Sequence, residues 1–316
     1  MKQTTINNIE ELLSFTRSIP GDSFGCYRGQ SDASWDLIPS FYRGLDEFKP
    51  LPSDFDDGEW LGELERDVYR DFEIKGRRFA PDRWEFHDPW HRMILAQHYG
   101  LPTRLLDWTK SPVVGAYFAV TANVDRDGVL WYLDVSAMQF PTELGRRMPD
   151  AGFRLTQIEN CISRDQLSFH WPVSHNVVSS IPATAKPLKS QAIPSDQSGD
   201  SELDGFLVVI EPPVLEGRLH SQKSLFTVYI SYDQQQLVWN HLSYIEQMEQ
   251  YHSKSLLTKL VIPCDVKNRL KRELETNMIN VDDIYPDLPG LVERLKRKRN
   301  DAFGFWKEDR KKWLTA

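Results

Sequence analysis

The stretch AQHYGLPTRLLDWT at residues 96–109 joins the end of a helix, a turn and a strand. Residues 88–99 carry apolar side chains at helical spacing, and Gly100 and Pro102 end the predicted helix. Residues 105–108 are mostly apolar, which predicts a buried strand or a strand-like segment. These changes of chain direction bring the polar side chains of the stretch toward one small volume, which makes it a candidate site.

Asp107 is the carboxylate of the chain that we most expect to be buried, because it lies between Leu106 and Trp108. A buried carboxylate needs a paired charge or hydrogen bonds. Arg28 and Arg104 are its natural partners. Such a pair fits either a structural latch or a ligand site, and the residues alone leave both open.

A second candidate segment lies upstream, where residues 24–29 predict a short strand that carries Arg28 near its end. An arginine there can hold a phosphate or a carboxylate with its planar fork, and Gly29 would let a ligand approach the backbone. Gln30 follows directly. The alternative is an internal ion pair between Arg28 and an aspartate of the 96–109 stretch.

Helices and strands alternate around these two segments. Ser111 and Pro112 predict the start of a helix, as N-cap and first helical residue. The strands follow no strict βαβ rhythm, so we expect an α+β fold with a central mixed or antiparallel sheet split by helices, a helical N-terminal lead and a helical C-terminal tail. Further helices are predicted at 7–17, 59–78, 234–249, 265–277 and 289–313, and further strands at 35–40, 128–135, 205–211, 225–232 and 256–263.

One domain is expected to cover residues 7–265, with a long insertion at about 141–204. The second half of this insertion is dense in Ser, Pro, Gln and Asp, which is typical of a surface segment. Residues 266–316 are predicted to form a helical extension packed on the domain, because they hold too many apolar side chains for a free arm. Lys and Arg are frequent in this extension, but acidic residues dilute them, so a solvated helix face is favoured over nucleic-acid binding.

The composition narrows the class of protein. The 316 residues are 40% apolar, include 10 Trp and carry a formal net charge of −8, which fits a packed cytoplasmic protein that does not attract polyanions. Three cysteines lie far apart, which excludes a disulfide framework and a cysteine-based zinc site. His87 and His91 are only a faint metal signal, so no metal is expected. No apolar run approaches the roughly 20 residues of a membrane span, and residues 1–6 show no secretory signal.

Two longer patterns contain the candidate segments: YRGQSxxxWxLxPSxxR at residues 27–43 and AQHYGLPTRLLDWTxSPxxxAYFA at residues 96–119. Together they resemble the FRG domain, a family named for its Phe/Tyr-Arg-Gly motif. The run PDLPGL at residues 286–291 is similar to the end of that family. The resemblance covers roughly residues 9–295, apart from the insertion, and the family is described by its sequence rather than by a reaction.

A second resemblance is to the ADP-ribosyltransferase fold of the Arg-Ser-Glu class. The early Arg-Gly of that class corresponds to Arg28 and Gly29, and its later strand and helix correspond to residues 107–111 and 115–119. This resemblance implies NAD as cofactor, held at Arg28. Where the class has a catalytic Glu, the nearest residue here is Gln222. Its amide can bond a ribose hydroxyl but cannot supply the negative charge that stabilises an oxocarbenium-like transition state.

The resemblances imply a nucleotide cleft with Arg28, Asp107 and Gln222 in the catalytic positions and with Trp108 or Tyr99 on its wall. We consider an ADP-ribosyltransferase-like enzyme, a module that senses a nucleotide or small anion or contacts a protein partner, and a nucleic-acid binder. The missing Glu favours the second hypothesis over the first, and either suits a bacterial stress or phage-defence system. The implied cofactor-binding residues are Arg28, Gly29, Gln30, His98, Tyr99, Arg104, Trp108 and Thr109.

Overall fold

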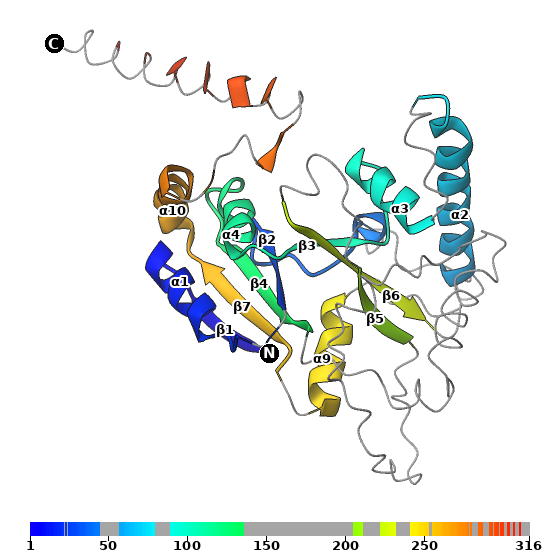
Figure 1. Ribbon diagram of the computed structural model, residues 1–316, viewed down its shortest axis with the longest axis horizontal. Coiled ribbons are helices and arrows are strands. Elements are labelled where there is room, and N and C mark those ends of the chain that lie inside the picture. Colours follow the sequence, from blue (N-terminus) through cyan, green and yellow to red (C-terminus); the bar gives the residue numbers. More distant parts are fainter. Residues whose placement is uncertain are drawn as a thin grey trace.

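A computed structural model shows a twisted sheet with helices on both faces (Figure 1). The predicted insertion at about 141–204 and residues 234–240 of a predicted helix lie outside the described residues. The structure describes residues 1–21, 23, 25–44, 57–79, 89–135, 205–210, 222–231, 241–252, 255–277, 279, 284–286, 291–292, 294–296, 298–299, 302–303, 306 and 310.

Within this part of the chain, seven strands form one sheet in the order β1-β7-β4-β2-β3-β6-β5. The edge strand β1 runs parallel to β7, and the other neighbouring pairs are antiparallel, so the sheet is mixed. Together with the helices, this sheet confirms the predicted α+β class. The strands are β1 (Lys2–Thr5), β2 (Gly25–Gln30), β3 (Leu106–Thr109), β4 (Gly128–Asp134), β5 (Gly205–Ile210), β6 (Ser224–Ser231) and β7 (Leu257–Ile262).

Two apolar cores hold the helices against the two faces of the sheet. The core that includes Tyr27 and Leu130 also takes side chains of α1, α4 and α10. The core on the other face includes Cys26 and Trp131 and takes side chains of α9. Neighbouring residues of β2 thus serve opposite faces, as a pleated strand requires. The helices are α1 (Ile9–Ser18), the 3-10 helix η1 (Ser40–Tyr42), α2 (Asp57–Gly76), α3 (Pro89–His98), α4 (Pro112–Val120), α9 (His241–His252) and α10 (Cys264–Asn277).

The strand predicted at residues 35–40 is wrong, because this segment is an extended connector that ends in η1 at Ser40. Its backbone groups bond to other elements instead of to a neighbouring strand. The carbonyl of Leu37 accepts from the backbone N–H of His241 at 3.1 Å. Pro39 has no N–H to give to a ladder, which explains why the apolar pattern misled the prediction.

Helix α4 begins as predicted and then packs unusually close to β2. Ser111 Oγ accepts from the backbone N of Val114 at 3.3 Å, and Pro112 opens the first turn. A Cβ atom on Gly29 would lie only 1.9 Å from the carbonyl oxygen of Gly115. The packing of α4 therefore accounts by itself for a glycine at position 29, where the sequence suggested room for a ligand.

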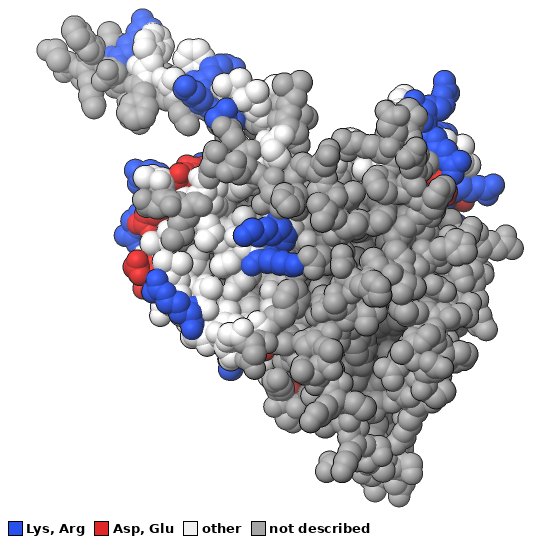
Figure 2. Space-filling view, in the orientation of Figure 1, with Lys and Arg blue, Asp and Glu red and all other residues white. Residues whose placement is uncertain are grey.

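The C-terminal region combines buried and exposed parts. Leu270 and Leu274 of α10 are buried on the domain, and so is Ile284. Farther on, the described tail extends away from the sheet in Figure 1, and Figure 2 shows Lys and Arg side chains along it. Helix α10 and Ile284 therefore pack on the domain, whereas several large apolar side chains of the tail are 38% to 56% exposed: Leu291, Val292, Leu295, Phe303 and Trp306.

Two structural features are absent from the described residues: a membrane-spanning helix and a cluster of metal-binding side chains. None of the described helices has both the length and the apolar composition that a bilayer-crossing helix needs. The same residues contain no group of three or more His, Cys, Asp or Glu side chains arranged to hold a metal ion. Cys26 and Cys264 are both free thiols, and Cys26 lies in the core.

Candidate functional site

The sheet parts between β2 and β3. Residue pairing joins these strands at Tyr27 and Thr109, and beyond this pair a cleft of about 720 Å³ opens. Arg28 follows Tyr27 on β2 and lines the cleft. Ligand pockets typically enclose roughly 300–1,000 Å³, so the cleft has the size of a small-molecule site.

Most of the predicted site residues line this one cleft. They are Arg28, Gly29, Gln30, Asp107, Trp108, Thr109 and Gln222. His98, Tyr99 and Arg104 are not part of its lining. The rings of His98 and Tyr99 pack edge to face against each other at the end of α3, with centroids 5.3 Å apart. The two sequence segments therefore meet, while the roles assigned to their residues stay predictions.

Arg28 places a positive charge in the cleft without a close carboxylate. Its Nη1 donates to the backbone carbonyl of Asp107 at 2.7 Å, whereas the Asp107 carboxylate lies 3.7 Å away. The side chain is only 12% exposed, and its buried Nε has no hydrogen-bond partner. Burial lowers the pKa of Arg28 to about 10; the charge of Asp107 opposes this shift and that of Arg43 adds to it. Arg28 is therefore a buried cation whose charge is only partly compensated.

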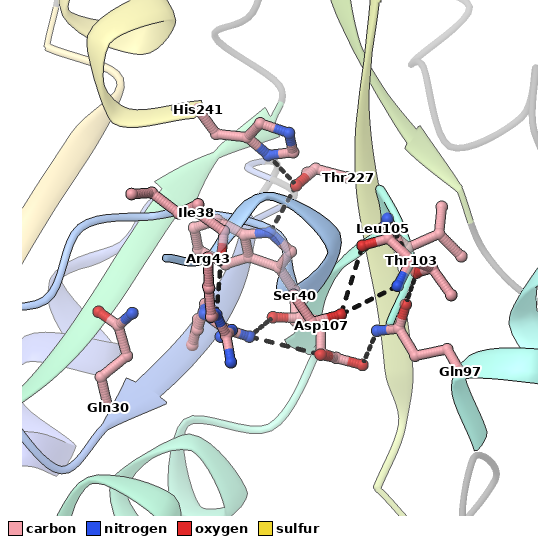
Figure 3. A network of polar contacts seen from close by, with 12 residues as sticks. Gln30, Ile38, Ser40, Arg43, Gln97, Thr103, Leu105, Asp107, Thr227 and His241 are labelled. Atoms are coloured by element: carbon pink, nitrogen blue, oxygen red, sulfur yellow. Dashed lines mark hydrogen bonds and ion pairs between the residues drawn. The ribbon is translucent and has the colours of Figure 1, made fainter. Parts of the chain in front are cut away.

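Asp107 is not the buried carboxylate that the sequence predicted. Its side chain is 59% exposed, and its Oδ1 accepts from Gln97 Nε2 at 2.6 Å (Figure 3). Strand alternation explains the difference: Leu106 and Trp108 point into the core, so the residue between them points the other way. The latch between two buried charges, Arg28 and Asp107, is therefore absent.

Arg104 lies outside the cleft and forms a closed ion pair. Its Nε donates to Glu65 Oε1 at 2.7 Å, and its Nη2 contacts the second carboxylate oxygen. Burial favours the neutral guanidine, but the charge and hydrogen bonding of Glu65, together with Tyr42 and Tyr69, outweigh it and raise the pKa of Arg104. Glu65 belongs to α2 and is only 3% exposed. The pair fastens α2 to the segment before β3, which is a structural role.

The polar atoms of Gln30 and Thr109 are engaged within the protein. Gln30 Oε1 accepts from Trp131 Nε1 at 2.6 Å, and Gln30 Nε2 donates to the carbonyl of Asp36 at 3.0 Å. Thr109 Oγ1 donates to the carbonyl of Gln222 at 2.6 Å. These two residues therefore shape the wall of the cleft and hold its strands in place.

Gln222 lies at the edge of the cleft just before β6. Its Nε2 donates to the backbone carbonyl of Ile284 at 3.1 Å, so the amide attaches the C-terminal segment to the cleft. Next to this contact, Tyr285 packs edge to face on Phe118, which also lines the cleft, with ring centroids 6.3 Å apart. A glutamate at position 222 could not donate this hydrogen bond.

Trp35 and Arg43 are among the cleft residues that sequence reasoning missed. Trp35 is 50% exposed, and both residues line the cleft. The exposed Arg43 is anchored through Nε, which donates to the carbonyl of Ile38 at 3.1 Å (Figure 3). The signal was available, because both are fixed positions of the pattern at residues 27–43. Their place in the connector, outside any strand, is what the sequence did not reveal.

Behind the cleft wall runs a buried hydrogen-bonded chain. Trp108 Nε1 donates to Thr227 Oγ1 at 2.9 Å, which lies 3.0 Å from His241 Nδ1 (Figure 3). Burial, together with the charge of Arg28, lowers the pKa of His241 to about 3. A neutral imidazole can accept at Nδ1 from the Thr227 hydroxyl or, as the other tautomer, donate to it, so this chain is satisfied without a second buried cation.

Comparison with known proteins places this cleft within a family. No curated protein and no solved structure matches the chain. Residues 24–128 match the family model of the FRG domain. The matched span runs from β2 to the start of β4 and includes both segments that form the cleft, although it is shorter than the span of the resemblance. The chain therefore carries an FRG domain at residues 24–128.

Proposed function

We propose that the cleft between β2 and β3 binds a nucleotide of the NAD type, with a phosphate at Arg28. The observation that carries this proposal is the state of Arg28: a guanidinium that is mostly buried, lacks a partner at Nε and forms a long ion pair, 3.7 Å, with the exposed carboxylate of Asp107. A buried charge normally has close partners. Charged groups perturbed by burial inside a cleft are characteristic of ligand sites.

The charges around the cleft support an anionic ligand. Arg28 and Arg43 line it together, and their mutual repulsion contributes to the lowered pKa of Arg28. Asp36 and Asp107 also line the cleft, but both are exposed, where water screens their charge. The buried cation therefore acts at the lower dielectric and attracts a phosphate more strongly than the two carboxylates repel it.

The position of Gln222 favours binding without turnover. An oxocarbenium-like transition state needs a negative charge beside it, and an amide supplies none. In addition, the Gln222 amide donates to Ile284, which gives it a structural task. The protein then acts as a ligand-sensing module, and a place in a bacterial stress or phage-defence system stays a prediction.

Calorimetric titration with NAD and with ADP-ribose tests the binding site. We expect the parent protein to bind both, and Arg28→Ala to weaken binding by about tenfold to a hundredfold, the effect of losing charged hydrogen bonds worth about 1.5–3 kcal/mol. Arg272→Ala is the matched control, because it removes an arginine charge from the exposed side of α10. Equal affinity of the Arg28→Ala variant and the parent for both ligands would refute the assignment.

An ADP-ribosyltransferase-like enzyme is the second candidate, because Arg28 and Gly29 end a strand within the cleft lining. Release of nicotinamide from NAD distinguishes the two candidates. We expect no release above the uncatalysed rate from the parent protein. Steady release that disappears in Arg28→Ala and persists in Arg272→Ala would establish the enzyme instead.

A further inference from the structure

Trp35 presents an indole ring at the cleft with half of the residue exposed to solvent. It lies in the connector between β2 and η1, five residues beyond the end of β2. An exposed tryptophan leaves a large apolar surface in water, and covering that surface with a ligand ring is favourable. The ring is therefore available to contact a ligand that occupies the cleft.

The backbone around Trp35 is held firmly, so its exposure is not a result of loose structure. The Asp32 carboxylate, which is 5% exposed, accepts from Ser34 N at 2.9 Å and from Arg126 Nη1 at 2.8 Å. The backbone N of Trp35 in turn donates to the carbonyl of Asp32 at 3.2 Å. Ala33 N donates to the carbonyl of residue 127 at 2.7 Å, which ties the connector to the turn before β4.

Two lysines from other elements attach the same connector to the domain. Lys259 Nζ of β7 donates to the carbonyl of Ala33 at 2.9 Å. Lys267 Nζ of α10 is fully buried and donates to the carbonyls of Ser31 at 2.7 Å and Asn123 at 2.9 Å. The connector therefore presents the ring from a rigid support, and a rigid aromatic surface loses little conformational entropy when it binds a flat partner.

The cleft offers two kinds of contact. Arg28 and Arg43 provide planar cations that suit phosphate oxygens. Trp35 provides a half-exposed aromatic face, and stacking of a base on such a face is tolerant of the base's identity. An inorganic phosphate would satisfy only the first kind of contact, and an uncharged aromatic compound only the second.

We propose that Trp35 is a stacking platform for the planar base of the nucleotide, so that the cleft selects base-bearing phosphates over phosphates without a base. This inference rests on the proposed function, because it assumes that the phosphate lies at Arg28. Adenine and nicotinamide are both flat heteroaromatic rings, and either has the chemistry that the indole recognises. The ring and the guanidinium contribute independently, one to the choice of ligand and the other to charge recognition.

Calorimetric titration of the full chain with NAD, ADP-ribose, nicotinamide mononucleotide and inorganic pyrophosphate tests the inference. We expect Trp35→Ala to weaken NAD binding by about fivefold to a hundredfold, because stacking of one base is worth about 1–3 kcal/mol. Pyrophosphate affinity should change by less than about twofold, since its contacts are charged. Trp35→Phe keeps an aromatic face and should recover most of the NAD affinity.

The two single-base ligands identify which ring is stacked. A loss shared with ADP-ribose assigns adenine, and a loss shared with nicotinamide mononucleotide assigns nicotinamide. Trp306→Ala is the matched control, since this tryptophan is 56% exposed on the tail and lies outside the lining of the cleft. Thermal melts of each variant confirm that the compared proteins are folded.

The outcomes separate this inference from the proposed function. If Arg28→Ala weakens NAD binding while Trp35→Ala does not, the nucleotide site stands and the stacking platform is refuted. Equal losses of NAD and pyrophosphate affinity in Trp35→Ala also refute it, because the ring would then only support the connector. If the parent protein binds neither NAD nor ADP-ribose, the proposed function fails and the inference fails with it.

Discussion

The side chains of Arg28 and Arg104 are 12% and 33% exposed, and the surroundings of these two partly buried arginines differ in one respect. Arg104 meets a carboxylate that is itself buried, that of Glu65, and makes two contacts with it. Arg28 meets the backbone of Asp107, and the carboxylate of that residue is 59% exposed. The pKa of Arg104 is raised, because Glu65 together with Tyr42 and Tyr69 outweighs its burial, whereas burial lowers the pKa of Arg28 to about 10.

The proposed binding role of Arg28 rests on this difference from a structural arginine. A buried pair that satisfies both partners has no capacity left for a ligand, and removing one partner exposes the cost of burying the other. A buried arginine whose carboxylate partner is exposed to solvent can still attract an anionic ligand. Burial alone does not distinguish the two cases, but the exposure of the partner does.

The largest loss of stability is expected when the ion pair between Arg104 and Glu65 is broken. Arg104→Ala should lower the free energy of unfolding by about 3–5 kcal/mol, because it leaves the Glu65 carboxylate buried without its cation. Urea denaturation at pH 7 measures this loss. The double variant Arg104→Met with Glu65→Leu should regain most of the stability, since it removes both charges. A loss below about 1 kcal/mol in Arg104→Ala would remove the contrast with Arg28.

Gly29 adjoins Arg28 in sequence, but its role is structural, because it lets α4 pack closely on β2. Gly29→Ala should cost about 3 kcal/mol of stability, since its Cβ would lie 1.9 Å from Gly115 O and 2.8 Å from Ala119 N, both backbone atoms. Gly21→Ala is the matched control, with nothing within 4 Å of the added atom. Melting temperatures of the two variants measure the difference. Similar stability of both would mean that α4 moves away without cost.

The buried ring of His241 should make the stability of the protein depend on pH. The pKa of His241 is about 3 in the folded protein and about 6.5 in an unfolded chain. Between these pH values the imidazole is protonated in the unfolded state and neutral in the folded state. Stability should therefore fall as the pH drops from 6.5 toward 3, by about 2 kcal/mol between pH 6.5 and 5. His241→Gln keeps an acceptor for Thr227 and should lose that much less than the parent over this interval. Equal acid sensitivity of both proteins would contradict a neutral buried ring.

The smallest effect on stability is expected for Arg28 itself. Arg28→Ala should change the free energy of unfolding by about 1 kcal/mol or less, because Asp107 remains solvated and loses no essential partner. Combining it with Asp107→Asn should give additive effects within about 0.5 kcal/mol. A cost of about 3–5 kcal/mol that Asp107→Asn rescues would instead make this pair a latch like that of Arg104.

Local signals in the sequence predicted local structure well. The strand at 24–29 appears as β2, and Ser111 with Pro112 starts α4, because strand pattern and capping depend on neighbouring residues. The sequence also predicted that Arg28 and the 107–109 segment lie near each other, and both line the cleft. In each case the information lies within a few residues of the element that it determines.

The failures share a cause in tertiary contacts. The partner of Arg104 is Glu65, 39 residues earlier on α2, and no spacing rule points to it. Asp107 alternates away from the core and lines the cleft, and this cleft forms only when β2, β3 and the connector come together. The packing that requires Gly29 involves a helix more than 80 residues later. Such contacts follow from the assembled fold and leave no periodic trace in the sequence.

The single residue pair between β2 and β3 also has a mechanical consequence. A continuous hydrogen-bonded ladder resists bending, but here the half-sheets β1-β7-β4-β2 and β3-β6-β5 meet at Tyr27 and Thr109 and at the Arg28 side chain. Side chains of both half-sheets share the core around Cys26 and Trp108, so side-chain packing rather than a hydrogen-bonded ladder fixes the angle between them. A ligand bound in the cleft as proposed would contact residues of both half-sheets and would add to the contacts that hold them at that angle.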